Sequence, residues 1–295
     1  MSSTDQPGSV FVFGTGRSGT TVLMRMLACH PELAWISNYN ERFVKNPRLS
    51  FFSRSRNFDL TAGQLKGWKR YLPIPREAIE VPRYVTNGLF QSRYVLEPQD
   101  IDPAAVYAYR DYITHLMRWQ GKNRFLHKHT GFARAHFLNQ LDPNGQFVQI
   151  VRDGRAVAYS LMRVEWWDGS MRSWWWGEMP SKYREEYEKS EHNPVILAGI
   201  VWKHLLDLTH LELHSLPEKR MLTISYTDFV RDPMTKLEQI CAHCDLEMND
   251  IFVRRLKHFR IRNADEAWQR GLPSTQIELL NDSLGEHLAR FGFEI

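Results

Sequence analysis

Apolar residues along the chain gather in short runs that alternate with longer helical patterns. Four of these runs predict buried strands: Val10–Phe13, Arg124–His127, Phe147–Val151 and Met221–Tyr226. Leu33–Ser37 predicts a weaker fifth strand, and Thr20–Cys29 and Ile196–Leu213 carry apolar side chains at helical spacing. Near-continuous apolar strands that alternate with helices favour a mostly parallel sheet covered on both faces. We therefore expect an α/β fold of three layers, with a central sheet flanked by helices.

The chain has no internal repeat and no linker rich in Pro, Gly and Ser, so we expect a single domain over residues 1–295. Five of its ten tryptophans lie in Glu165–Pro180, a stretch of little regular pattern. We interpret residues 164–192 as a Trp-rich insertion that forms a lid or part of a substrate site.

Composition narrows the class of protein. The longest apolar run, Val195–Trp202, is far shorter than the roughly 20 residues of a membrane helix. The amino-terminal residues lack the pattern of a secretory signal, and three cysteines suit a reducing compartment. We expect a cytoplasmic protein without stable membrane insertion. The pair Cys241 and Cys244 stands in an amphipathic helical pattern with no second pair, which favours packing over metal or redox chemistry.

The net charge of +4 is too mild for a nucleic-acid binder, which usually carries a strong basic stripe. It suits a protein whose ligand is a small polyanion held by a few arginines. The turn GTGRSGTT, Gly14–Thr21, follows the first strand and opens a helix. Its glycines let the backbone approach a ligand, and its amide N–H groups and helix dipole favour an anion.

The spacing of this turn nearly matches the phosphate-binding pattern G-x-x-x-x-G-K-[ST]. Thr20 replaces the lysine, and a cation stands three residues earlier as Arg17. An ordinary turn capped by Ser18 is the alternative, although a cap needs neither three glycines nor an arginine. Because the helix dipole supplies only about 0.3–1 kcal/mol, further cations must come from elsewhere in the chain.

The stretch QFVQIVRDGRAVAYSLMR supplies them, because a buried strand ends there at Arg152 and a helix follows that carries Ser160. A guanidinium at the carboxyl end of a strand lies on the edge where parallel sheets bind ligands, and its fork suits a phosphate. The alternative is a local ion network in which Asp153 pairs with Arg152 or Arg155.

R-S-G-T-T after the first strand and V-R-D-G-R-A-x-x-x-S after a later one together resemble the sulfotransferases that use 3'-phosphoadenylyl sulfate (PAPS). The resemblance is to the bacterial and tyrosylprotein branch, because the cytosolic steroid and phenol enzymes carry a lysine at the position of Arg17. It extends to ISYTDFVRDP, Ile224–Pro233. It implies a P-loop-like nucleotide-binding fold, PAPS as co-substrate and adenosine 3',5'-bisphosphate (PAP) as product.

The resemblance also assigns candidate contacts to the nucleotide. The turn residues would wrap the 5'-phosphosulfate: Gly16, Arg17, Ser18, Gly19, Thr20 and Thr21. Arg152 and Ser160 would hold the 3'-phosphate, and Tyr226 would lie near the adenine. Arg270, in the weakly matching WQRG, is a further candidate for the 3'-phosphate, with an ordinary helix end as the alternative.

The reaction implied is in-line transfer of a sulfuryl group, for which the protein supplies positioning and charge, as in phosphoryl transfer. Lys128, at the end of RFLHK, would stabilise the leaving oxygen with Arg17, and no metal is required. The general base stays open between two residues. Glu41, with Arg42 beside it, lies in the region of the catalytic glutamate of the tyrosylprotein branch, a couple of residues later than ungapped counting gives, whereas His129 is one position from the histidine of the cytosolic branch.

The acceptor is a small molecule, a carbohydrate, a lipid or lipid-linked sugar, a phenol or a peptide tyrosine, and the sequence does not choose among them. The tryptophans Trp166, Trp167, Trp174, Trp175 and Trp176 would form an acceptor wall or cover the core of the insertion. The basic segment Asn46–Asn57 would meet an anionic acceptor or be a solvated loop. Two rival functions remain: an ATP-dependent P-loop kinase of small molecules, and a non-catalytic PAP-binding module.

Overall fold

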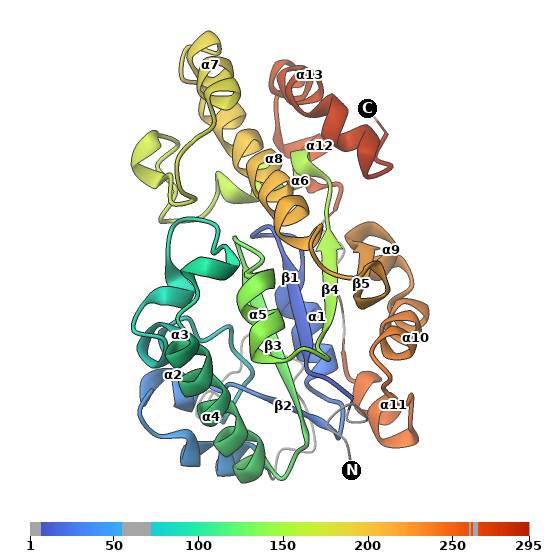
Figure 1. Cartoon of the computed structure of the whole chain (residues 1–295). Coiled ribbons are helices and arrows are strands. Elements are labelled where there is room, and N and C mark those ends of the chain that lie inside the picture. The colour runs from blue at the N-terminus through green and yellow to red at the C-terminus, as the bar shows by residue number, and fades with distance from the viewer. Residues whose placement is uncertain (1–6, 55–71, 260, 262–264, 295) are drawn as a thin grey trace.

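Five parallel strands form the centre of the protein (Figure 1). The computed structural model describes residues 7–54, 72–259, 261 and 265–294 of the 295-residue chain. The strands are β1 Val10–Gly14, β2 Leu33–Trp35, β3 Arg124–Thr130, β4 Gln146–Val151 and β5 Met221–Ser225. Their order across the sheet is β2-β3-β1-β4-β5, and every neighbouring pair is parallel. The predicted α/β fold is confirmed.

Helices flank the sheet on both faces and extend beyond its carboxyl edge (Figure 1). They are α1 Thr20–Leu27, α2 Asn38–Arg42, α3 Glu80–Val85, α4 Pro103–Gln120, α5 Ala135–Leu141, α6 Gly154–Leu161, α7 Ser181–Lys189, α8 Pro194–Leu213, α9 Tyr226–Arg231, α10 Pro233–His243, α11 Asp250–Leu256, α12 Ala267–Gly271 and α13 Ser274–Arg290. Short 3-10 helices include η1 Pro47–Ser53 and η5 Met171–Ser173.

Two strand boundaries differ from the prediction in ways that affect the site. β3 continues past His127 because its ladder with β1 persists to the pair Gly14 and Thr130. β5 ends at Ser225, whose side chain accepts a hydrogen bond from the backbone N–H of Asp228 and caps α9. Tyr226 therefore begins a helix instead of ending a strand.

Side chains of the central strands alternate between two covered faces. In β1, Val10 and Val12 face a cluster built with α1, α9, α10 and α11, whereas Phe11 and Phe13 face a cluster built with α3, α4 and α5. Each large apolar side chain buried in this way stabilises the fold by about 1.5–3 kcal/mol. The two clusters explain why these strands read as almost unbroken apolar runs.

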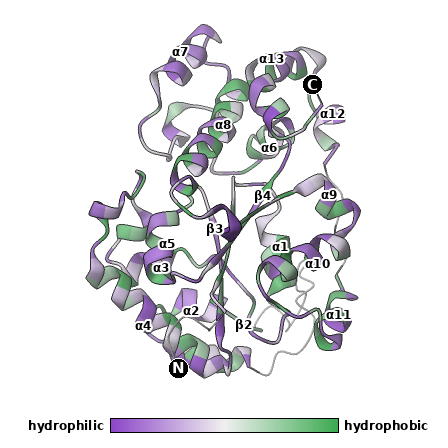
Figure 2. Ribbon diagram, turned by 45° about the vertical axis from the view of Figure 1, so that its right-hand side comes forward, coloured by the Kyte–Doolittle hydropathy of each residue, from purple (hydrophilic) through white to green (hydrophobic). Residues whose placement is uncertain are grey.

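A third cluster lies beyond the carboxyl ends of the strands and joins α6, α7, α8, α12 and α13. Its centre is α8, which is buried around most of its circumference and is more hydrophobic in Figure 2 than the outer helix α7. None of the helices in the described ranges is both long and apolar enough to cross a membrane. The cytoplasmic location stays a prediction.

The chain continues to opposite faces of the sheet after the neighbouring strands β1 and β3. α1, which follows β1, packs on one face, and α5, which follows β3, packs on the other. The carboxyl ends of such a strand pair form a crevice where α/β proteins bind ligands. The register places Val12 beside Lys128 and Gly14 beside Thr130 at this crevice.

Candidate active site

The turn after β1 is shaped by two residues with positive φ. Arg17 has φ 70° and Gly19 has φ 89°. A Cβ at Gly19 would lie 2.4 Å from Cδ2 of Tyr226, so only glycine fits there. A Cβ at Gly16, by contrast, would have no atom within 4 Å, which leaves this stretch of backbone open to a ligand.

The amino terminus of α1 is not capped by a side chain. Gly19 is its N-cap residue, and Ser18 instead shares a hydrogen bond of 2.5 Å with the Thr15 hydroxyl. The turn is therefore not the ordinary Ser18-capped turn. The amides of its first turn lack the side-chain oxygen that usually satisfies them, and such amides form a binding site for an anion.

The side chain of Arg17 reaches from this turn to α6. Its Nε donates a hydrogen bond of 2.9 Å to Oγ of Ser160. Two residues that are 143 positions apart in the sequence thus lie side by side at the mouth of the turn.

Arg152, at the end of β4, completes the basic side of the turn. Its NH1 donates to the carbonyl oxygen of Arg17 at 3.1 Å, and its guanidinium lies 4.6 Å above the ring of Tyr226. Its Nε donates to Oδ1 of Asp265 at 3.0 Å, and both side chains are almost fully buried. The fork is thereby fixed in orientation beside the turn.

Arg155, by contrast, makes contacts that hold parts of the fold together. Its guanidinium pairs with Asp153, donates to Asn281 and to the carbonyl of Glu294, and stacks 4.4 Å from the ring of Trp268. The predicted ion network at Asp153 therefore exists with Arg155 and not with Arg152. Because Asp153 also caps α6, its carboxylate is occupied and does not resemble a free metal-binding aspartate.

Lys128, on β3, forms an ion pair and a short hydrogen bond with Glu77, a residue that the sequence did not single out. The other carboxylate oxygen of Glu77 accepts hydrogen bonds from the Thr130 N–H at 2.8 Å and from its hydroxyl at 2.6 Å. Only 7% of the Lys128 side chain and 17% of the Glu77 side chain are exposed. We call Glu77, Lys128 and Thr130 the reactive cluster.

The electrostatics of the cluster keep Glu77 ionised. Burial by itself raises the pKa of this carboxyl, but the charge of Lys128, the proximity of His129 and the hydrogen bonds from Lys128 and Thr130 outweigh it. The net result is a pKa below the ordinary value for glutamate. Glu77 is therefore an ionised, partly buried carboxylate.

Backbone pairing brings Glu77 to this position. Pro75 forms a bridge with Ser37, and the N–H of Arg76 donates to the carbonyl of Ile36 at 2.9 Å. The segment before α3 is thus tied to the carboxyl end of β2, next to β3. Glu77 stands 51 positions before Lys128 in the sequence, between Pro75 and α3, and no motif of the sequence marks it.

His129 is a poor base in this setting. Its ring packs 5.1 Å from that of Phe90, and its Nδ1 lies 4.0 Å from Oε1 of Glu77. Burial lowers the pKa of His129 to about 3, against the attraction of Glu77. The imidazole is therefore neutral over the ordinary pH range and lies beside the reactive cluster.

The structure does not bring Glu41 to Lys128, whose carboxylate partner is Glu77. Glu41 lies in α2, and the guanidinium of its neighbour Arg42 lies 5.8 Å from the ring of Phe43. Arg270 is exposed on α12, and no contact of its side chain with the turn after β1 is recorded in the described residues. The predicted roles of Glu41 and Arg270 stay untested.

The other predicted features divide between packing and surface. Segment Asn46–Ser53 packs through η1 on α4, with the ring of Phe51 6.4 Å from that of Trp119, and residues 55–57 lie outside the described ranges. Burial raises the pKa of both Cys241 and Cys244 to about 12, so these thiols are protonated and pack in the core.

A cleft of about 590 Å³ opens beside the reactive cluster. Its floor is the end of β3 and the turn that follows, His129–Phe132, and Thr130 belongs both to this floor and to the cluster. The tryptophans Trp166, Trp175 and Trp176 line it, whereas Trp167 is buried in the third core cluster. The Trp-rich segment thus contributes both to the core and to a wall beside the site.

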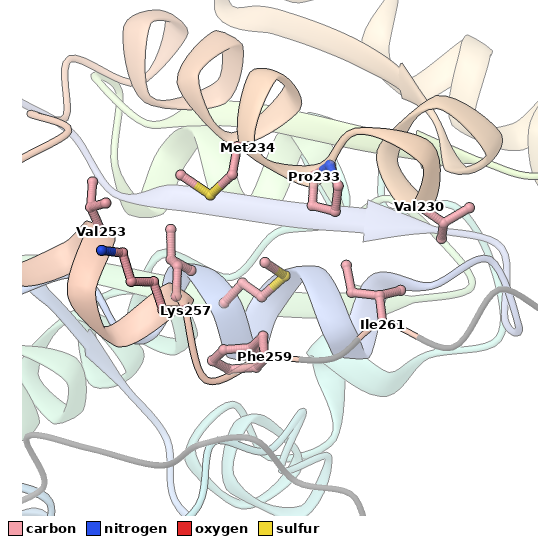
Figure 3. Close-up of a pocket in the computed structure, with 9 residues that line it drawn as sticks. Val230, Pro233, Met234, Val253, Lys257, Phe259 and Ile261 are labelled. Carbon is pink, nitrogen blue, oxygen red and sulfur yellow. The ribbon is translucent and has the colours of Figure 1, made fainter.

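A second hollow of about 340 Å³ has a different character (Figure 3). Its lining is aliphatic and aromatic, with Lys257 as the charged residue among those described, and it lies between α1, α10 and α11. Figure 3 shows Met234, Val253 and Phe259 converging on it. Lys257 is the single charged group among its described lining residues, whereas the crevice between β1 and β3 brings Lys128 and Glu77 together beside the turn after β1.

A sequence profile of the sulfotransferase family matches residues 7–250. The match covers most of the chain, and the chain therefore belongs to the sulfotransferase family.

Individual relatives agree with this assignment. The chain is 22% identical over 275 residues to a protein-tyrosine sulfotransferase of Drosophila melanogaster, covering 93% of this chain and 44% of that protein. It thus spans less than half of the length of this relative.

Among solved structures, sulfotransferase STF9 from Mycobacterium avium superposes with a TM-score of 0.60 at 15% identity, over 98% of this chain and 78% of that one. The sulfotransferase domain from the curacin biosynthetic pathway gives 0.53 at 16% identity, over 98% and 99% of the two chains. At these identities the similarity establishes the fold.

Proposed function

We propose that this protein transfers a sulfuryl group from PAPS to a hydroxyl or amine of an acceptor, with a small molecule, carbohydrate or phenol as the acceptor class. The observation that carries the proposal is the reactive cluster, in which Lys128 and an ionised Glu77 lie at the crevice beside the anion-binding turn. Membership of the sulfotransferase family supports it.

The residues present fit the nucleotide. The open backbone at Gly16 and the uncapped amino terminus of α1 form a cradle for the 5'-phosphosulfate, in which Arg17, Ser18, Gly19, Thr20 and Thr21 take part. Arg152 and Ser160 would hold the 3'-phosphate, with Tyr226 near the adenine. When bound, PAPS supplies the sulfuryl group and a phosphate as the leaving group.

The chain supplies charge at the point where the leaving oxygen would develop it. Lys128 lies two residues before the end of β3, and its ammonium is held in place by Glu77, while Arg17 is held by Ser160 of α6. A cation that is fixed in place, such as the buried ammonium of Lys128, stabilises a developing negative charge without reorganising.

Glu77 is the general base in this proposal, in preference to the sequence-based candidates Glu41 and His129. Its carboxylate is ionised, lies at Lys128 and is oriented by Thr130, so it accepts the proton of the acceptor hydroxyl at the edge of the cleft. A base positioned in this way contributes typically 10²–10⁴-fold to the rate.

The test is mass spectrometry of a pooled library of phenols, sugars and tyrosine peptides incubated with PAPS and the full chain. One acceptor class should gain the mass of one SO3, and Lys128→Met should abolish the gain while calorimetric PAP binding stays within about threefold of wild type. Unchanged turnover in this variant would remove Lys128 from the mechanism.

An ATP-dependent kinase is distinguished by adding a chelator, which should stop phosphoryl transfer and leave sulfuryl transfer intact. The occupied carboxylate of Asp153 weighs against the kinase, because a P-loop kinase holds Mg²⁺ with an aspartate at the end of a strand. A non-catalytic PAP-binding module would bind PAP and modify no member of the library.

A further inference from the structure

The cleft beside the reactive cluster has an aromatic wall that is partly open to solvent. Trp166 and Trp175 are each about half exposed, and their ring centroids lie 6.0 Å apart. The ring of Trp176 lies 6.5 Å from that of Trp166, and it approaches Gly131 at the floor. Exposed tryptophans that line one cleft are typical of a surface on which a ring stacks.

The charged residues that line the cleft are all basic among those described. Three of its lining residues are the arginines Arg83, Arg93 and Arg134, and none of its described lining residues is acidic. Arg83 pairs with Glu80 at 2.9 Å on the exposed side, so its charge is partly offset. Among the residues that the structure describes, no carboxylate pairs with Arg93.

Arg93 stacks on the aromatic wall of the cleft. Its guanidinium lies 5.5 Å from the ring of Trp175. A guanidinium that stacks through its flat face keeps its edge N–H groups for a bidentate hydrogen bond, the geometry that matches a carboxylate or phosphate. Stacking and anion recognition are thus compatible in one side chain.

The floor of the cleft adds a buried positive charge. Arg134 is buried, donates to the carbonyls of Tyr94 and Ser92, and its Nε has no partner among the described residues. Glu212 on α8 holds the same turn by accepting hydrogen bonds of 3.0 Å from the N–H groups of Ala133 and Ala135. The carboxylate of Glu212 also interacts electrostatically with Arg134, so the net positive charge beneath the floor is smaller than that of the guanidinium alone.

On the basis of the proposed function, we propose that the acceptor is a hydroxylated ring, aromatic or sugar, that carries an anionic group. The ring stacks on the wall of Trp166, Trp175 and Trp176, the anion pairs with Arg93, and the hydroxyl faces Glu77. A cleft of about 590 Å³ holds a molecule of this size.

Equilibrium dialysis of the PAP-saturated full chain tests this acceptor class with two matched probe pairs. The first pair is para-hydroxyphenylacetate and its uncharged analogue tyrosol, and the second is methyl glucuronide and methyl glucoside. In at least one pair the acid should bind about tenfold tighter than its neutral partner, the effect of one charge-assisted contact. The pair that shows the preference identifies the ring as aromatic or sugar.

Three variants assign the contact. Arg93→Gln should remove the preference for the acid, and Trp175→Ala should weaken both members of the preferred pair. Arg83→Gln is the matched control and should change the preference less than threefold, because Glu80 already offsets its charge. A full preference in Arg93→Gln, or its loss in Arg83→Gln, would overturn the assignment to Arg93.

The experiment distinguishes a wrong acceptor class from a wrong proposed function. If PAP binds but neither acid is preferred, or no probe binds, the anionic ring is wrong and the sulfotransferase proposal stands. If PAP itself does not bind to the chain, the proposed function is wrong as well.

Discussion

Replacing Arg152 by alanine should weaken PAP binding on the order of 100-fold. The guanidinium is fixed by the carbonyl of Arg17, the ring of Tyr226 and the carboxylate of Asp265, so it is orientated before the ligand arrives. Loss of one hydrogen bond to a charged phosphate costs about 1.5–3 kcal/mol. Since about 1.4 kcal/mol corresponds to a factor of ten, this loss alone gives a weakening of about 10- to 150-fold.

The position of Asp265 predicts an additional effect. In Arg152→Ala this buried carboxylate loses its Arg152 partner and would repel the phosphate. Two unit charges about 4 Å apart interact by about 4 kcal/mol at an effective dielectric constant of about 20, and a larger separation reduces this. The double variant Arg152→Ala/Asp265→Asn should therefore regain about tenfold of the lost affinity.

Isothermal titration calorimetry of PAP into the full chain measures these effects, and thermal denaturation checks that each variant folds. Arg163→Ala is the matched control, because this exposed arginine lies just past α6 and contacts Tyr159. Its PAP affinity should equal that of wild type. An Arg152→Ala variant that folds and binds PAP within threefold of wild type would refute the placement of the nucleotide beside β4.

Other predictions address the base, the turn and the fold. Glu77→Gln should lower kcat by about 10²–10⁴-fold, whereas the control Glu80→Gln should leave kcat unchanged. Because the pKa of Glu77 is lowered, the rate of the wild-type enzyme should fall only in acid, below the ordinary glutamate pKa near 4.3. Gly19→Ala should destabilise the protein by about 1–3 kcal/mol in urea denaturation, because of its φ of 89° and a clash at 2.4 Å, whereas Gly16→Ala, with no atom within 4 Å, should fold normally. Asp207→Asn should cost about 1–3 kcal/mol at neutral pH. Burial raises the pKa of Asp207, but hydrogen bonds from α7 and α13 hold it below its ordinary value, so the wild type loses this stabilisation as the pH falls through the folded pKa. The difference in melting temperature between wild type and Asp207→Asn should therefore narrow in acid, and a constant difference would contradict this account.

Local patterns in the sequence predicted most of the fold. The apolar runs predicted the positions of all five strands. In the structure, as expected from the sequence, the glycine-rich turn after β1 lies at the same edge of the sheet as Arg152, which follows β4. Strand ends were less accurate, because the ladder between β1 and β3 decides where β3 stops. The longer β3 places Lys128 and Thr130 on the strand, where both contact Glu77.

Glu77 followed from no local pattern, and the Trp-rich stretch did not decide which tryptophans line the cleft. Glu77 acquires its role only because the bridge between Ser37 and Pro75 carries it to the carboxyl end of β3. The aromatic wall likewise depends on the packing of one tryptophan, Trp167, into the core while its neighbours face solvent.

The sequence by itself determined the strands, the glycine-rich turn after β1 and the basic residues near it, because each depends on conformational preferences and spacing within a short stretch. Only the tertiary structure decided which carboxylate meets Lys128 and which side chains line the cleft. Those contacts join segments that are distant in the chain, and strand order and packing, rather than any local preference, bring them together.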